Sequence, residues 1–190
     1  MWKNPSQPSL FRYTFTSSTN WTVPLNVKSA YISIAGGGAG GISGNTGSAT
    51  TSLVSGSSGG FLISYPLNLI PGEIIPITIG AGGEAGLAPN GGVGHTTMFG
   101  SYLSCTGALE SNPAAEAQSF PGSCGTKGGM GVYGQYVETY GGWVSGGNTP
   151  LGYGSGGRVF RCNNRYSCPE PNATIGYSGT QGVVIIDVLY

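Results

Sequence analysis

Glycine tracts interrupt this chain along its whole length and constrain its fold more than any other feature. The most prominent are GGGAGG at residues 36–41, GAGGEAG at 80–86, GGMGVYG at 128–134 and GYGSGG at 152–157. Glycine has no side chain to bury, so a folded tract must find partners for its backbone N–H and C=O groups. The tracts are therefore either extended threefold helices like polyproline II, bonded to one another through their backbones, or solvated flexible loops. A collagen triple helix is excluded, because Gly does not recur at every third position for more than a few triplets.

The rest of the composition shows that the chain folds, and it limits the partners. Glycine and proline supply 37 and 12 of the 190 residues, yet 11% of the residues are aromatic and the formal net charge is zero. Disordered chains have few aromatic residues and a high net charge, so we expect an ordered protein. Seven basic and seven acidic residues leave no excess charge for nucleic acid or for an anionic membrane. Because no run reaches the roughly 18–20 apolar residues of a membrane helix, we predict no membrane insertion, and the first 13 residues lack the apolar core of a secretion signal.

Alternating apolar and polar residues predict an all-β fold. Five runs rich in β-branched or aromatic residues are expected strands: residues 10–16, 30–35, 61–67, 74–80 and 182–190. The last run is nearly continuous in β-branched residues, which is typical of a central strand, and we expect Val183, Ile185 and Val188 in the core. Pro76 has no N–H, so its strand is expected at a sheet edge, or with its first residues outside the ladder. These features favour a β-sandwich, jelly-roll-like, with long glycine-rich loops or polyglycine II helices.

The chain changes character between about residues 105 and 180. Gly, Ser, Tyr, Asn and Pro dominate there, and no run is long enough for a convincing pair of strands. A loop region of that length in a compact domain indicates either functional loops or tracts with their own regular structure.

Known catalytic and metal-binding patterns are matched only formally. Gly36-x-Gly38-x-x-Gly41 resembles a dinucleotide fingerprint, and Gly56-x-Ser58-x-Gly60 resembles a nucleophile elbow, but no helix follows either motif. The seven carboxylates are scattered, and the single imidazole, His95, is interpreted as a structural or surface residue. We therefore predict no enzymatic activity, no cofactor and no metal.

Four cysteines, Cys105, Cys124, Cys162 and Cys168, allow several states. Cys105–Cys124 and Cys162–Cys168 are the disulfide pairs that close the shortest loops. Their spacing matches no zinc ribbon or finger. Reduced buried thiols are the alternative for a protein that matures in a cytosol.

Aromatic side chains spaced among Gly, Ser and Asn suggest a recognition surface in the second half of the chain. Tyr and Trp give rigid amphipathic area, while Gly, Ser and Asn adapt around them, as in antibody binding loops. Three arginines fall close together without an intervening acid, and their guanidinium groups could bind carboxylate or phosphate groups of a polysaccharide. The candidate ligand-binding residues are Tyr133, Tyr136, Tyr140, Trp143, Tyr153, Arg158, Arg161, Arg165 and Tyr166. The competing interpretation is that these aromatics only cover the glycine layer and that the arginines are solvated.

Four segments resemble the glycine-rich domain of bacteriophage tail fibre and receptor-binding proteins. In chain order they are residues 21–38, residues 69–83, residues 91–100 and residues 179–186. In each segment an expected strand or a turn that begins with Pro stands next to a glycine tract. The sequence is also similar to the adhesins that cap the long tail fibres of T-even-like phages. Residues 14–190 are thus predicted to be one domain, and residues 1–13 an N-terminal arm or attachment segment.

The resemblance implies an all-β domain at the distal tip of a fibre, with stacked polyglycine II helices and tip loops that contact the host. The expected function is non-enzymatic binding of a bacterial surface polysaccharide or outer-membrane protein by a virion tail-tip protein, with other tail-fibre subunits, or further copies of the chain, as partners. The alternative is a structural, filament-forming protein whose glycine-rich domains stack without a ligand. Residues 105–168 match no motif of the family.

Overall fold

A computed structural model describes residues 10–45, 56–87, 91–108, 118–120, 123–124, 153–154, 156–157, 159–161 and 173–189. The described part is all-β. Its strands are β1 (Leu10–Phe15), β2 (Thr19–Thr22), β3 (Ser29–Ala35), β4 (Ile42–Asn45), β5 (Phe61–Asn68), β6 (Ile74–Thr78), β7 (Gly86–Leu87), β8 (Thr97–Phe99), β9 (Leu103–Cys105), β10 (Gln118–Phe120), β11 (Ser123–Cys124), β12 (Val159–Arg161), β13 (Ala173–Gly176) and β14 (Val183–Leu189).

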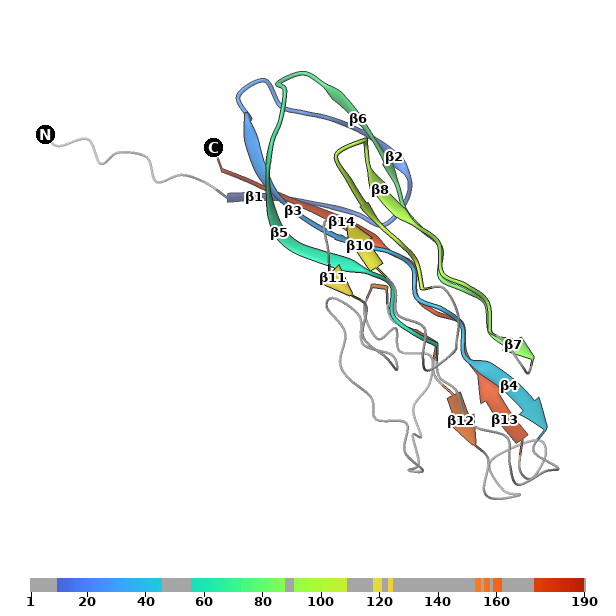
Figure 1. The fold of residues 1–190 in the computed structure, drawn as a ribbon. Coiled ribbons are helices and arrows are strands. Elements are labelled where there is room, and N and C mark those ends of the chain that lie inside the picture. Colours follow the sequence, from blue (N-terminus) through green and yellow to red (C-terminus); the bar gives the residue numbers. More distant parts are fainter. Residues whose placement is uncertain are drawn as a thin grey trace, which may run out of the picture.

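Two antiparallel sheets form a β-sandwich at one end of the molecule (Figure 1). Sheet A has the strand order β1-β14-β3-β5, and sheet B has the order β11-β10-β9-β8-β6-β2. Each of the five predicted strands is present, and each of their ends lies within two residues of the expected end. β14 lies between β1 and β3, so the prediction of a central last strand is confirmed. Residues 10–13, which the sequence placed in an arm, pair with β14 as part of β1.

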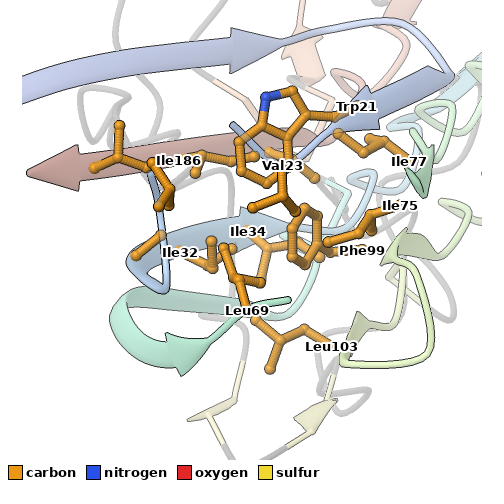
Figure 2. Close-up of a cluster of buried hydrophobic side chains, with 14 of the residues drawn as sticks. Trp21, Val23, Ile32, Ile34, Leu69, Ile75, Ile77, Phe99, Leu103 and Ile186 are labelled. Carbon is orange, nitrogen blue, oxygen red and sulfur yellow. The ribbon is translucent and has the colours of Figure 1, made fainter. Parts of the chain in front are cut away.

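The sandwich core is built from the inward-facing residues of both sheets (Figure 2). Ile32 and Ile186 from sheet A meet Ile75 and Phe99 from sheet B, and all four are almost completely buried. Phe99 also lies between two other aromatic rings, with centroid distances of 6.1 Å to Trp21 and 6.2 Å to Tyr102. Interdigitated side chains of this kind keep two stacked sheets about 10 Å apart.

The expected core positions of the last strand are buried, but on two faces. Val188 belongs to the core between the sheets. Val183 and Ile185 lie in a second cluster with Ala35. A strand covered on both faces requires apolar residues at successive positions, which explains the continuous VVII run.

The prediction that Pro76 marks a sheet edge is wrong, because β6 lies between β2 and β8. The second alternative holds on one side of the strand only: β8 pairs with Ile77 and Thr78, so Pro76 is outside that ladder, whereas on the other side Ile74, Ile75 and Pro76 pair with β2. The Pro76 carbonyl accepts from the N–H of Gly100 at 2.8 Å. The N–H and C=O of one strand residue point to the same side of the strand. An N–H at residue 76 would therefore face the turn after β8, and its absence removes no hydrogen bond between β6 and β8.

The molecule is elongated, and its two ends differ (Figure 1). β1 begins and β14 ends at the sandwich end, where Leu10 pairs with Leu189. A third, small sheet with the order β12-β13-β4-β7 lies at the opposite end. We call it the distal sheet. Between the two ends lie the described glycine tracts at residues 36–41 and 80–86, which lead from the sandwich to this sheet.

Candidate functional site

The tract at residues 36–41 continues β3 and is held entirely by backbone hydrogen bonds. All six of its N–H groups donate to carbonyls at 2.8–2.9 Å, and the acceptors repeat every three residues. Gly36 and Ala39 donate to one segment, Gly37 and Gly40 to a second, and Gly38 and Gly41 to a third. Their acceptors are Gly60 and Ser57, then His95 and Gly92, then Thr180 and Tyr177. A period of three is that of an extended polyproline II-type helix, so the helical alternative is correct for this tract.

Six other segments surround this central tract. Three of them accept hydrogen bonds from its N–H groups, as described above. The other three donate hydrogen bonds to its carbonyls: one through Gly83 and Gly86, one through Ala108 and one through Gly157. The six segments also bond to one another around the ring, in the order 56–60, 106–108, 91–95, 80–85, 177–182 and 154 with 156–157. Gly56 closes the ring by donating to Gly157 at 2.8 Å. We call these seven segments the glycine bundle.

Side chains are excluded from most of the bundle by the closeness of the backbones. A Cβ added at Gly37 would overlap the carbonyl of Ala81, and one added at Gly83 would overlap the carbonyl of Gly92. The two buried alanines, Ala39 and Ala108, pack against each other. Five of the six surrounding segments are direct continuations of sandwich strands. The core side chains hold the two sheets apart in the sandwich. In the bundle the segments have almost no side chains, so the continuations of the two sheets come together and bond through their backbones.

The bundle carries the distal sheet, which is our candidate functional site. The central tract runs into β4, and residues 80–85 run into β7, with which β4 pairs in parallel. On its other side β4 pairs antiparallel with β13, which leads back into residues 177–182. The chain leaves this sheet at Asn45, Leu87 and Arg161 and returns at Ala173. It therefore lies at the end of the molecule farthest from the start of β1 and the end of β14 (Figure 1).

Of the predicted ligand-binding residues, the structure places Arg161 in this site. Arg161 is the last residue of β12 and pairs with Thr174 of β13. Seven predicted residues lie outside the described part of the chain: Tyr133, Tyr136, Tyr140, Trp143, Arg158, Arg165 and Tyr166. The tract at 128–134 also lies outside it.

Tyr153 lies elsewhere and packs against the chain itself. Its half-buried side chain contacts the cluster of Ala35, Val183 and Ile185 on the outer face of sheet A, together with Phe61. Next to it, Gly154 donates to the carbonyl of Gln181 at 2.8 Å. Tyr153 therefore covers the outer face of sheet A, next to the glycine bundle.

The structure also decides between the alternatives for Cys105, which does not form a disulfide. Its buried Sγ lies 3.6 Å from the carbonyl oxygen of Ile34, to which it donates. The Cys105–Cys124 bridge, one of the alternatives left open by the sequence, does not form, because β10 lies between β9 and β11. Two strand spacings of about 4.8 Å exceed the roughly 7 Å that a disulfide can span between Cα atoms. Cys162 and Cys168 lie outside the described residues.

Sequence reasoning missed the distal sheet, and no signal could have revealed it. Its strands have two to four residues, and one of them, β4, reads ISGN. Near it, Tyr177 and Val93 on the bundle are exposed apolar side chains. His95 is exposed, as expected, and it contributes backbone groups to the bundle.

Among the residues in the described ranges, no three His, Cys, Asp or Glu side chains gather in a way that could hold a metal ion. At the sandwich end, the hydrogen bond that Tyr102 donates to Glu73 at 2.7 Å raises the pKa of the tyrosine above its usual value. None of the described elements is a helix capable of crossing a membrane.

Comparison with protein-family models and with curated proteins found no match to this chain.

Proposed function

We propose that this chain is a non-enzymatic receptor-binding domain at the tip of a bacteriophage tail fibre, where it recognises a bacterial surface polysaccharide or an outer-membrane protein. The observation that carries the proposal is the polarity of the molecule. The sandwich holds the beginning of β1 and the end of β14 at one end, and the glycine bundle holds the distal sheet at the other (Figure 1). A domain attached by its chain ends would thus present the distal sheet outward.

The bundle suits such a role because it fixes its seven segments without using their side chains. The strand ends at Asn45, Leu87, Arg161 and Ala173 are held together through backbone bonds. Residues outside the bundle can then be selected for recognition rather than for packing, and binding residues are commonly found on loops held by a rigid scaffold. The near-neutral charge of the chain favours contacts through aromatic, hydroxyl and amide groups over binding to polyanions.

Binding of the purified chain to intact bacteria, measured by flow cytometry over a panel of strains, tests the proposal. For a strain that binds, Arg161→Ala and Trp143→Ala at the predicted recognition surface should each weaken binding at least about fivefold, as expected for side chains that contribute about 1 kcal/mol or more. Lys28→Ala, a matched removal of an exposed cation from the sandwich end, should leave binding unchanged.

Equal binding by all three variants would refute the predicted recognition surface, and unchanged binding by Arg161→Ala would refute its location at the distal sheet. The filament-forming alternative predicts a different result: particles that lengthen with protein concentration in electron micrographs, with no strain-specific binding.

A further inference from the structure

A depression of about 380 Å³ lies on the outer face of sheet A, at the sandwich end of the molecule. It is formed where β3 begins and where β5 and β14 end. Its lining residues are Ser29, Ala30, Tyr31, Pro66, Leu67, Asn68, Asp187 and Leu189. The volume falls within the range of small-molecule sites. Tyr153 covers the same face farther along β14, toward the bundle, and does not line the depression.

The strand register defines the size of the depression. Tyr31 pairs directly with Asp187 on one side and with Pro66 on the other, so three residues form a row across three strands. Neighbouring strands are about 4.8 Å apart, which makes this row about 10 Å wide. Ser29 and Asn68 form the next pair of residues on the same face, about 7 Å along the strands. A frame of this size accommodates one pyranose ring.

The side chains in this frame have the chemistry of a site for a neutral sugar. Tyr31 is 47% exposed on an interior strand of sheet A. Its flat ring offers an apolar surface for the C–H face of a sugar. Ser29 and Asn68 are exposed beside it, and they bring a hydroxyl and an amide that donate and accept hydrogen bonds.

The carboxylate of Asp187 is held in place for further hydrogen bonds. Its side chain is only 13% exposed, and Arg12 donates to its two oxygens at 2.7 Å through Nε and at 2.8 Å through Nη2. Each carboxylate oxygen can accept two hydrogen bonds, so one acceptor position on each remains for a ligand hydroxyl. Because Arg12 balances the charge, the pair favours a neutral ligand over an ionic one.

We propose that this depression is a binding subsite for a single neutral hexose or N-acetylhexosamine ring. The site is separate from the distal sheet and does not depend on the proposed function. An apolar protein segment fits the lining less well, since it would cover the Asp187 carboxylate and the Asn68 amide without giving them hydrogen-bond partners. For one ring of this size the dissociation constant is expected at about 1–10 mM.

Titration of the ¹⁵N-labelled chain with D-glucose, D-galactose and N-acetyl-D-glucosamine to about 50 mM, followed by amide shifts, tests the proposal at the expected affinity. At least one sugar should shift the amides of Tyr31, Asn68 and Asp187 in a saturable manner. Sorbitol, an acyclic polyol with the same hydroxyl chemistry, should not. Tyr31→Ala should weaken binding about tenfold or more, whereas Tyr31→Phe should keep it within about threefold, because the ring supplies the contact. Tyr177→Ala removes a comparably exposed tyrosine from the bundle and should change nothing.

Dispersed amide spectra of each variant would establish that it is folded. The proposal is overturned if no ring sugar shifts these amides, if sorbitol shifts them equally, or if Tyr31→Ala binds like the parent chain. It is also overturned if light scattering reveals a dimer that Tyr31→Ala dissociates, because the face would then be a protein interface. Loss of sugar binding by Tyr31→Ala with unchanged binding to bacteria would separate this subsite from the proposed tip function.

Discussion

Replacing Gly37 by alanine tests whether the glycine bundle is a packed core or a set of loops, because the two predict changes of opposite sign in the free energy of unfolding. Gly37 is not among the described glycines with positive φ, which are Gly72, Gly100 and Gly154. In a flexible loop, a glycine with such a backbone can become alanine with a gain of about 0.4–1 kcal/mol, because the unfolded chain loses entropy. In the bundle, the added Cβ would overlap the carbonyl of Ala81 and lie 3.1 Å from the nitrogen of His95.

The cost follows from the hydrogen bonds that must be disturbed to make room. Gly37 donates to His95, Ala108 donates to Gly37, and His95 donates to Ala81, each at 2.9 Å. At about 1–2 kcal/mol for each buried bond that is broken or distorted, the three together cost about 3–6 kcal/mol. That is a large part of the roughly 5–15 kcal/mol of a typical domain, and for this chain length it lowers Tm by about 6–24 °C.

The assay is urea denaturation, checked by calorimetry, of the parent chain, Gly37→Ala and a control, Gly72→Ala. At Gly72 the φ angle is +81° and an added Cβ would meet only Leu25 Cδ2, at 3.4 Å. The control should therefore lose only the roughly 1–2 kcal/mol of a left-handed residue that gains a Cβ. If Gly37→Ala were neutral, stabilising or no worse than Gly72→Ala, the bundle would not be the packed layer described above.

Three further predictions concern the sandwich. Phe99→Ala should lower the free energy of unfolding by about 3–5 kcal/mol in urea denaturation, because Phe99 is fully buried between Trp21 and Tyr102; a loss below 1 kcal/mol would mean that the site is not packed. Tyr102→Phe should reduce stability near pH 7, because a pKa raised in the folded state gives stability that is present below the unfolded value of about 10 and is lost as pH rises through the folded value. The difference from the parent chain should therefore shrink as pH rises above about 10, and a difference that does not shrink would contradict the Glu73 hydrogen bond as its cause. Cys105 should resist alkylation in the native chain and react as a thiol in urea without reductant, measured by mass spectrometry, because its side chain is buried and forms no disulfide; rapid native labelling would contradict that burial.

The sandwich could be predicted from the sequence because a strand with one buried face carries its own signal. Ile32 and Ile34 alternate with exposed or polar positions in β3, and Ile75 and Ile77 do the same in β6. The uninterrupted VVII run of β14 indicated that this strand is buried on both faces. For Pro76, the sequence left open two ways to accommodate a missing N–H, and an edge strand was one of them. A ladder that ends beside the proline serves equally well, and where a ladder ends is set by the partner strand.

The bundle could be predicted only as a possibility, because glycine carries no information about its neighbours. Gly38 donates to Thr180 and accepts from Gly83, yet nothing in these residues distinguishes them from the many other glycines of the chain. Residues of the recognition surface were chosen by composition alone, and composition does not separate Tyr153, which covers sheet A, from Arg161 at the distal sheet.

The partners of the glycine tracts are encoded in the strands that lead into them. The central tract follows β3, which is flanked in sheet A by β14 and β5, and two of the six surrounding segments are the extensions of those strands. Three more extend β6, β8 and β9, which lie across the core in sheet B. Side-chain burial thus sets the registers in the sandwich, and those registers place each glycine opposite its carbonyl partner. Mutations that weaken the sandwich should consequently weaken the bundle as well, whereas Gly37→Ala should disturb the bundle first, and amide exchange in the two regions would reveal that asymmetry.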